Sequence, residues 1–120
     1  MGATLHSIYP RMKILVICSR NQWRSPTAEA VWNKVEGLTV RSAGTSPKAK
    51  RTVNASDIRW ADVIIVMETK HKQRLKARFK QLLQYQTIEV LDIPDEYQFM
   101  DPELVEIFEA EAENFLQNQA

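Results

Sequence analysis

The sequence has only one cysteine, Cys18, so the chain cannot form an intramolecular disulfide bond. A lone thiol is typical of a reducing compartment, and we expect the protein to be cytoplasmic. No apolar run approaches the length of a membrane span, and the N-terminus lacks the charged-then-apolar pattern of a signal peptide. The net charge of +1 gives no reason to expect a nucleic-acid or membrane partner.

The chain has 120 residues, the size of one compact domain. Hydrophobic residues make up 44% and charged residues 26%, as in an ordinary globular protein. Residues 1–11 show no clear period, whereas an apolar segment begins at Met12. We therefore interpret residues 1–11 as an N-terminal extension or tail, and residues 12–120 as the single domain.

From Met12 onward, short apolar runs alternate with segments of helical periodicity, which is the pattern of a βαβ protein. Four strands are predicted, at residues 14–17, 38–41, 63–67 and 87–91. Helices are predicted from Pro26 up to Gly37, briefly after Asn54, over residues 69–83, and from Pro102 onward. The expected fold is a small doubly wound α/β domain with a four-stranded parallel sheet and helices on both faces. Such a sheet binds ligands at the carboxyl ends of its strands.

The loop after the first strand has the chemistry of a phosphate site. Cys18 ends the strand, and Arg24 and Ser25 follow at the predicted start of a helix, with Ser25 as its N-cap. A helix N-terminus attracts a tetrahedral oxyanion and favours a cysteine thiolate. Arg24 can bind two phosphate oxygens at once, and the Ser25 hydroxyl can stabilise the sulfur. The predicted phosphate-binding residues are Ser19, Arg20, Asn21, Gln22, Trp23, Arg24 and Ser25.

Simpler interpretations exist for the individual residues of this loop. Cys18 alone fits a buried small hydrophobe, and Arg24 alone fits a surface charge. Their spacing after a strand and before a Ser-Pro helix start rarely arises by chance, so it favours the phosphate site. Elsewhere, His6 and His71 have no partner pattern for metal or triad chemistry and are expected at the surface. The sequence therefore indicates neither a metal site nor a cofactor.

Residues 12–29, together with Ser42-Ala43-Gly44-Thr45, resemble the low-molecular-weight protein tyrosine phosphatases. The loop of that family reads Cys-x-Gly-Asn-x-Cys-Arg-Ser-Pro, which is matched by Cys18, Asn21, Arg24, Ser25 and Pro26. The resemblance implies a phosphotyrosine phosphatase I-like fold and metal-independent hydrolysis. It also implies attack by the cysteine on a phosphomonoester and a phosphocysteine intermediate. The expected substrate is a phosphorylated protein or a small aryl phosphate.

The chain departs from the family pattern at three positions. Arg20 replaces a glycine and adds a charge beside the phosphate, and Trp23 replaces a second cysteine that many members have. Lys48 lies where the family often has an aromatic that flanks the substrate ring. The departures at Arg20 and Lys48 bear on phosphotyrosine specificity more than on the chemistry. Without the second cysteine, no protective disulfide with Cys18 can form, and we expect Cys18 to be prone to irreversible oxidation. The resemblance also gives Ser42 a bracing role through Asn21, the alternative being a serine that only serves a turn.

When the phosphoryl group is transferred, the oxygen of the leaving group needs a proton. In the family this proton comes from an aspartate in a loop before the last helix. Aligning residues 93–97 with that loop gives Asp95 as the general acid and Tyr97 as an aromatic wall. Asp101 precedes Pro102 and so has the literal Asp-Pro sequence of the family. Because Asp101 also fits the N-cap of the last helix, we favour Asp95 and keep Asp101 as the alternative.

Two other functions fit part of the pattern. One is arsenate reduction, which uses a similar oxyanion loop; because Cys18 is the only cysteine, the reaction needs an external thiol here. The other is a module that binds phosphate or phosphoproteins with weak or no turnover. Binding alone needs no acid, so the combination of Cys18, Arg24 and Asp95 favours the phosphatase.

Overall fold

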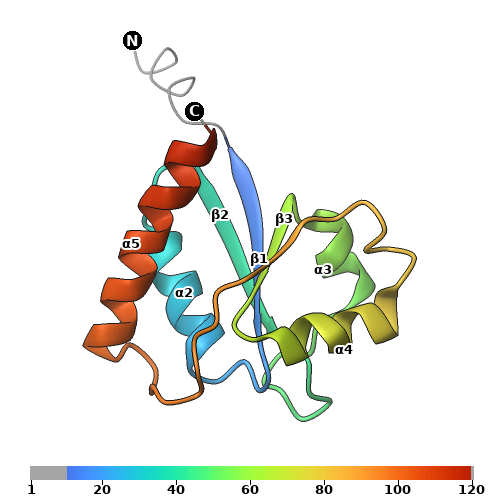
Figure 1. Cartoon of the computed structure of the whole chain (residues 1–120). Coiled ribbons are helices and arrows are strands. Elements are labelled where there is room, and N and C mark those ends of the chain that lie inside the picture. The colour runs from blue at the N-terminus through green and yellow to red at the C-terminus, as the bar shows by residue number, and fades with distance from the viewer. Residues whose placement is uncertain (1–10, 120) are drawn as a thin grey trace.

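The computed structural model of the chain describes residues 11–119. Nearly all of the extension predicted over residues 1–11 therefore lies outside the described residues. The predicted strands and helices are present, in the predicted order (Figure 1). They are β1 (Met12–Cys18), α2 (Arg24–Trp32), β2 (Leu38–Gly44), α3 (Ala55–Trp60), β3 (Val63–Val66), α4 (Thr69–Phe79), β4 (Ile88–Val90) and α5 (Pro102–Gln119).

The four strands form one parallel sheet in the order β2-β1-β3-β4. β1 is central, and its residues 14–17 are fully buried, as a continuous apolar run in a strand covered on both faces requires. Cys18 pairs with Gly44 of β2, and Ile17 pairs with Val66 of β3. The carboxyl ends of three strands therefore meet at one edge of the sheet, and Cys18 lies at that edge.

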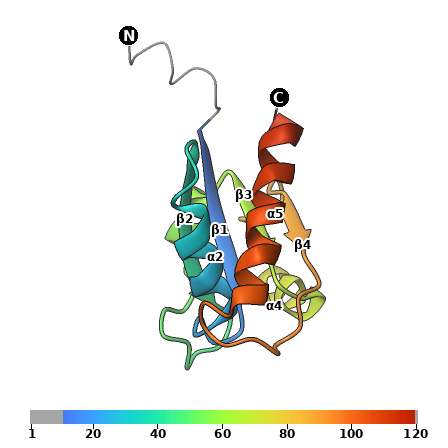
Figure 2. The same cartoon turned by 90° about the vertical axis from the view of Figure 1, so that its left-hand side faces the viewer.

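Helices cover both faces of the sheet, which confirms the predicted doubly wound architecture. α2 and α5 lie on one side of the strands, and α3 and α4 on the other (Figures 1 and 2). Trp32 of α2 and Phe108 of α5 are fully buried in the first core, where Trp32 Nε1 donates to the Phe108 carbonyl at 2.7 Å. Ile58 and Leu75 belong to the second core. No helix within residues 11–119 is long and apolar enough to span a membrane.

The helix after β1 differs from the prediction at both ends. α2 begins at Arg24, so the N-cap role predicted for Ser25 is wrong: Trp23 is the N-cap residue, and no side chain caps the helix. Ser25 lies in the first turn and is fully buried, because its hydroxyl faces the loop rather than the helix amides. α2 ends at Trp32, and Gly37 uses its positive φ of 93° in the turn toward β2.

The starts of two other helices are as predicted. Asn54 and Asp57 form a reciprocal capping box at the start of α3. At the start of α5, Asp101 Oδ1 accepts a hydrogen bond from the amide of Glu103 at 2.9 Å, which is the contact of a helix N-cap. α4 ends at Phe79, four residues earlier than predicted.

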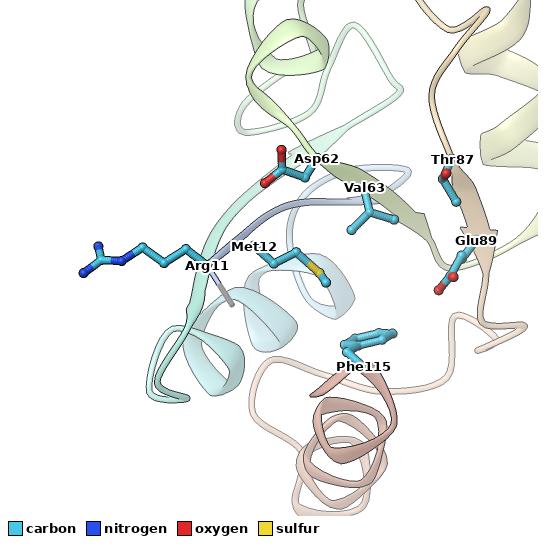
Figure 3. A pocket seen from close by; sticks show the side chains of 7 residues that line it. All are labelled: Arg11, Met12, Asp62, Val63, Thr87, Glu89 and Phe115. Atoms are coloured by element: carbon cyan, nitrogen blue, oxygen red, sulfur yellow. The ribbon is translucent and has the colours of Figure 1, made fainter. Parts of the chain in front are cut away.

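A pocket of about 370 Å³ lies at the amino-terminal edge of the sheet. Met12, Val63 and Phe115 gather at its centre, and Arg11 points away from them (Figure 3). Met12 and Val63 begin β1 and β3, so this pocket lies at the opposite edge from Cys18. Parallel sheets bind ligands at the carboxyl ends of their strands, and the candidate site is therefore sought at the Cys18 edge.

Candidate active site

Residues outside the loop from Cys18 to Arg24 donate hydrogen bonds to its backbone carbonyls and so hold the loop in place. The amide of Thr45 donates to the Cys18 carbonyl at 3.0 Å, and the amide of Ser46 donates to the Ser19 carbonyl at 2.9 Å. The next carbonyl of the loop accepts from Lys50 at 3.0 Å. The amide N–H groups of residues 20–23 donate to no other described residue. A ring of free amides at a helix N-terminus is an arrangement that binds a phosphate-like anion.

The sulfur of Cys18 is placed by a chain of polar side chains behind the loop. Cys18 Sγ lies 3.0 Å from Ser25 Oγ, and Asn21 Nδ2 donates to Ser25 Oγ at 3.0 Å. Asn21 Nδ2 also donates to Ser42 Oγ at 2.9 Å, which is the contact expected from the sequence, and Ser42 Oγ donates to Glu29. Asn21 has a φ of 52°, in the left-handed region that asparagine tolerates. All these contacts fix the loop around the sulfur.

The guanidinium of Arg24 is held in place rather than free. Only 2% of its surface is exposed, and Nη1 donates to Glu68 Oε2 at 2.5 Å and to the Ile93 carbonyl at 2.7 Å. Its Nε lies 3.6 Å from Oδ1 of Asp95. Nη2 has no hydrogen-bond partner among residues 11–119, so it remains available to an anion in the loop. Arg24 is thus oriented before any ligand binds.

Glu68 and His71 lie at the start of α4 and contact this arginine and the loop. Burial works to raise the pKa of Glu68, but the hydrogen bond and charge of Arg24 outweigh it and lower that pKa below its ordinary value. Glu68 is therefore a carboxylate at neutral pH. Burial, with the positive charge of Arg24, lowers the pKa of His71 to about 4. His71 is therefore neutral at pH 7.

The surface position predicted for His71 is wrong. Its side chain is fully buried, with Nδ1 accepting a hydrogen bond from the Glu68 amide at 3.1 Å and Nε2 lying 2.8 Å from Ser19 Oγ. The error has a physical reason. The basic residues of α4 give the helix the sequence of a solvated element, and only the fold brings β1 beside the start of this helix.

A pocket of about 40 Å³ opens over the loop. Its lining residues are Cys18, Ser19, Arg20, Gln22, Trp23, Arg24 and Asp95. Most of the predicted site residues are thus brought together around one small volume. Asp95, with 56% of its side chain exposed, lies at the rim on the Arg24 side.

Other predicted residues lie elsewhere. Asn21, Ser25 and Ser42 are buried behind the loop. Tyr97 is not among the residues lining this pocket: its ring packs against the first core and its hydroxyl contacts Glu103 Oε1 at 3.0 Å. The exposed aromatic side chain that lines the pocket is Trp23. Asp101 caps α5 and is likewise not a lining residue.

Sequence reasoning missed Glu68 and His71 as site residues and gave no packing role to Gly44. A Cβ atom on Gly44 would lie 2.6 Å from the Ser19 carbonyl oxygen, so only glycine allows β2 to approach the loop this closely. The sequence did contain a signal that could have identified Glu68 and His71 as site residues. Glu68 and His71 stand three residues apart directly after a buried strand, where polar side chains reach the ligand edge of a parallel sheet. Within residues 11–119, no cluster of three or more acidic, histidine or cysteine side chains is arranged to hold a metal ion.

Comparison with known proteins gives matches at the level of structure. No family profile and no curated protein sequence matches the chain. The structure is similar to a low-molecular-weight protein tyrosine phosphatase from Streptococcus pyogenes, with a TM-score of 0.74 and 19% identity over 91% of this chain and 93% of the other. It is also similar to Wzb from Vibrio vulnificus in complex with benzylphosphonate, with a TM-score of 0.72 and 22% identity over 92% and 99% of the two chains.

A third similar structure is the YwlE arginine phosphatase from Geobacillus stearothermophilus, with a TM-score of 0.63 and 21% identity over 88% of each chain. These proteins share the parallel sheet and helix layers found here. The chain therefore has the fold of the low-molecular-weight protein tyrosine phosphatases, as the sequence resemblance implied.

Proposed function

We propose that this chain, which has the fold of the low-molecular-weight protein tyrosine phosphatases, is a cysteine-dependent phosphomonoester hydrolase. The observation that carries the proposal is the juxtaposition of three groups at one small pocket. These are the Cys18 thiol, a ring of free backbone amides and the fixed guanidinium of Arg24. A nucleophile, an anion-binding ring and a charge clamp together are what phosphoryl transfer requires.

In the first step, the Cys18 thiolate attacks phosphorus, so an S–P bond forms as the bond to the leaving oxygen breaks. The loop amides and Nη2 of Arg24 bind the equatorial oxygens and neutralise their charge in the transition state. The Ser25 hydroxyl, 3.0 Å from the sulfur, stabilises the thiolate as attacker and again as leaving group. In the second step, water attacks the phosphocysteine, phosphate leaves, and the thiolate is restored.

We assign the general acid to Asp95. It lines the same pocket as Cys18, and its exposed carboxyl lies at the rim of that pocket, 3.6 Å from Arg24 Nε. In the first step Asp95 gives its proton to the leaving oxygen, and in the second it takes a proton from the attacking water. The carboxylate of Asp101 accepts a hydrogen bond from the amide of Glu103 and caps the start of α5. This structural role accounts for Asp101 without a catalytic one.

The preferred substrate in this proposal is a phosphotyrosine in a protein or a small aryl phosphate. Trp23 supplies an exposed aromatic surface beside the pocket, against which a substrate ring stacks. The similar structures include both tyrosine phosphatases and an arginine phosphatase, so the comparison leaves both phosphorylated residues as candidates. A direct comparison of phosphotyrosine and phosphoarginine peptides by kcat/KM decides between them, and a preference for phosphoarginine would overturn the tyrosine assignment.

The test of the chemistry is hydrolysis of a small aryl phosphate. Cys18→Ser should abolish turnover while vanadate or phosphate binding stays measurable. Asp95→Ala should reduce kcat by about 10²–10⁴-fold, the usual contribution of general acid catalysis. Asp101→Ala is the matched control, because it removes a carboxyl from the same loop that caps α5 and does not line the pocket, and it should cost stability rather than turnover.

Three outcomes would contradict the proposal in different ways. A wild-type protein that binds phosphopeptides at the loop but never turns over is a binding module and not an enzyme. Reduction of arsenate with an added thiol, without phosphatase activity, would make the protein a reductase. If Asp101→Ala is the crippling change, the acid assignment fails and the nucleophile assignment stands.

A further inference from the structure

The part-buried contact between His71 and Ser19 determines where the Ser19 hydroxyl proton points. His71 Nδ1 accepts a hydrogen bond from the backbone amide of Glu68, so Nδ1 carries no proton. A neutral imidazole then has its proton on Nε2. Because Nε2 lies 2.8 Å from Ser19 Oγ, the histidine is the donor in this contact and the serine oxygen is the acceptor.

A second donor reaches the same oxygen. Arg74 Nη1, on the next turn of α4, lies 3.5 Å from Ser19 Oγ and 3.4 Å from Thr45 Oγ1. A serine hydroxyl has two acceptor positions and one proton. His71 and Arg74 both supply hydrogens, so neither accepts the serine proton. No other described residue within residues 11–119 accepts it.

The Ser19 hydroxyl proton is therefore free to face the pocket, which Ser19 lines together with Cys18 and Arg24. We propose that Ser19 is a side-chain donor to a phosphoryl oxygen in the loop, and that His71 is the positioning residue that keeps its proton directed there. The inference rests on the proposed phosphatase function and adds a residue pair to it. Ser19 contacts the substrate, and His71 acts only through Ser19.

The burial of His71 supports this role. Its pKa of about 4 keeps the ring neutral across the range in which a phosphatase works, so the Nε2–H donor is constant. A protonated ring would place an Nδ1–H against the amide of Glu68 and break the contact that orients it. Arg24, Lys70 and Arg74 act on the ring with positive charge and Glu68 with negative charge, so the cations disfavour a further positive charge on His71.

The first measurement compares Ser19→Ala with the wild-type protein. A hydrogen bond to a charged oxygen is worth enough to predict about a tenfold or larger loss in kcat/KM for an aryl phosphate. The affinity for vanadate and for inorganic phosphate should fall by a similar factor. Equal kcat/KM and equal vanadate affinity in the two proteins would overturn the proposal while leaving the phosphatase function intact. Gln73→Ala, an exposed change on the same helix, is the control.

The second measurement separates positioning from packing. His71→Asn keeps an acceptor near Nδ1 for the Glu68 amide but loses the donor toward Ser19, whereas His71→Gln places an amide N–H near Nε2. We expect His71→Asn to lower kcat/KM several-fold and His71→Gln to restore part of it. The double variant of Ser19→Ala and His71→Asn should be no slower than Ser19→Ala alone. Additive losses would show that His71 acts through packing and would overturn its positioning role.

Phosphate binding distinguishes failure of this inference from failure of the proposed function. If the wild-type protein shows no turnover, the affinities of inorganic phosphate and vanadate still test the serine donor. A loss of affinity in Ser19→Ala would then support the donor in a protein that only binds phosphate. An unchanged affinity would overturn the donor in either case.

Discussion

Nη1 of Arg24 lies 2.5 Å from Oε2 of Glu68, although the two residues are 44 positions apart in the chain. Arg24 is 2% exposed and Glu68 is 30% exposed, so most of this pair is out of water. A buried guanidinium needs such a partner, because an unpaired charge at this depth is costly. The carboxylate therefore fixes the arginine and offsets its charge before a phosphate arrives.

Glu68→Gln should weaken both the fold and the site. The amide keeps the shape of the side chain but loses the charge that balances Arg24, and we expect unfolding to become easier by about 2 kcal/mol. The arginine should also be less well oriented, which lowers kcat/KM by about tenfold or more. Urea denaturation and aryl phosphate kinetics measure the two effects. The control is Glu109→Gln, an exposed change on α5, which should alter neither the stability nor kcat/KM. A Glu68→Gln enzyme as active as the wild type would contradict the orienting role of Glu68.

Gly44→Ala should disturb the loop through its backbone. The new Cβ would lie 2.6 Å from both the Ser19 carbonyl oxygen and the Ala49 Cβ, so β2 and the loop have to separate. We expect a loss of about 2 kcal/mol in stability and a clear fall in kcat/KM.

The matched control for this change is Gly37→Ala. Gly37 has a φ of 93° in a turn away from the site, so alanine there is strained and costs about 1–2 kcal/mol. That variant should keep the kcat/KM of the wild type. If the two variants lose activity equally, the effect of Gly44→Ala is one of stability alone.

Stability should fall as the pH drops below neutrality because of His71. Burial, followed by the charge of Arg24, lowers its folded-state pKa to about 4 from 6.5, so the unfolded chain binds the proton more readily. The stability that depends on a neutral His71 ring is fully present above pH 6.5 and is lost as the pH falls toward 4. The free energy of unfolding should be about 2 kcal/mol smaller at pH 5 than at pH 7. The pKa of Glu68 is also lowered in the folded protein, so protonation of this carboxylate at lower pH reduces the free energy of unfolding further.

Urea denaturation at pH 7 and pH 5 tests this dependence. His71→Asn has no titrating ring at this position, so its stability should change much less between the two values. An equally steep decline in that variant would assign the pH dependence to other groups.

Trp32→Phe should reduce stability without changing catalysis. Trp32 Nε1 donates to the Phe108 carbonyl at 2.7 Å inside the core between α2 and α5, and phenylalanine removes this hydrogen bond and leaves a small cavity. We expect a loss of about 2–3 kcal/mol by urea denaturation, with kcat/KM unchanged at temperatures where the variant is folded. Trp60→Phe, at a partly buried position, should lower the free energy of unfolding by a smaller amount. A large fall in kcat/KM for Trp32→Phe would show that this core contact reaches the site.

Much of the fold could be predicted because its signals are local. The apolar run over residues 14–17 predicted a buried central strand, and Asn54 with Asp57 predicted the start of α3. The end of α2 was misplaced, since nothing in the local pattern showed that the helix stops at Trp32, where a turn at residues 33–34 follows directly. Helix ends depend on small differences in local energy and are the least predictable boundaries.

The sequence by itself determined the loop from Cys18 to Ser25, because the strand end, the spacing to Arg24 and the helix start are all encoded within a few residues. Only the tertiary structure decided what surrounds it. Glu68, His71 and Asp95 come from segments distant in the chain, and the meeting of parallel strand ends brings them beside the loop. Asp95 lines its pocket, Glu68 contacts Arg24, and His71 contacts Ser19. The same packing buries His71 on a helix whose composition is that of a solvated surface. Burial and partner identity are properties of the whole fold, and no local pattern fixes them.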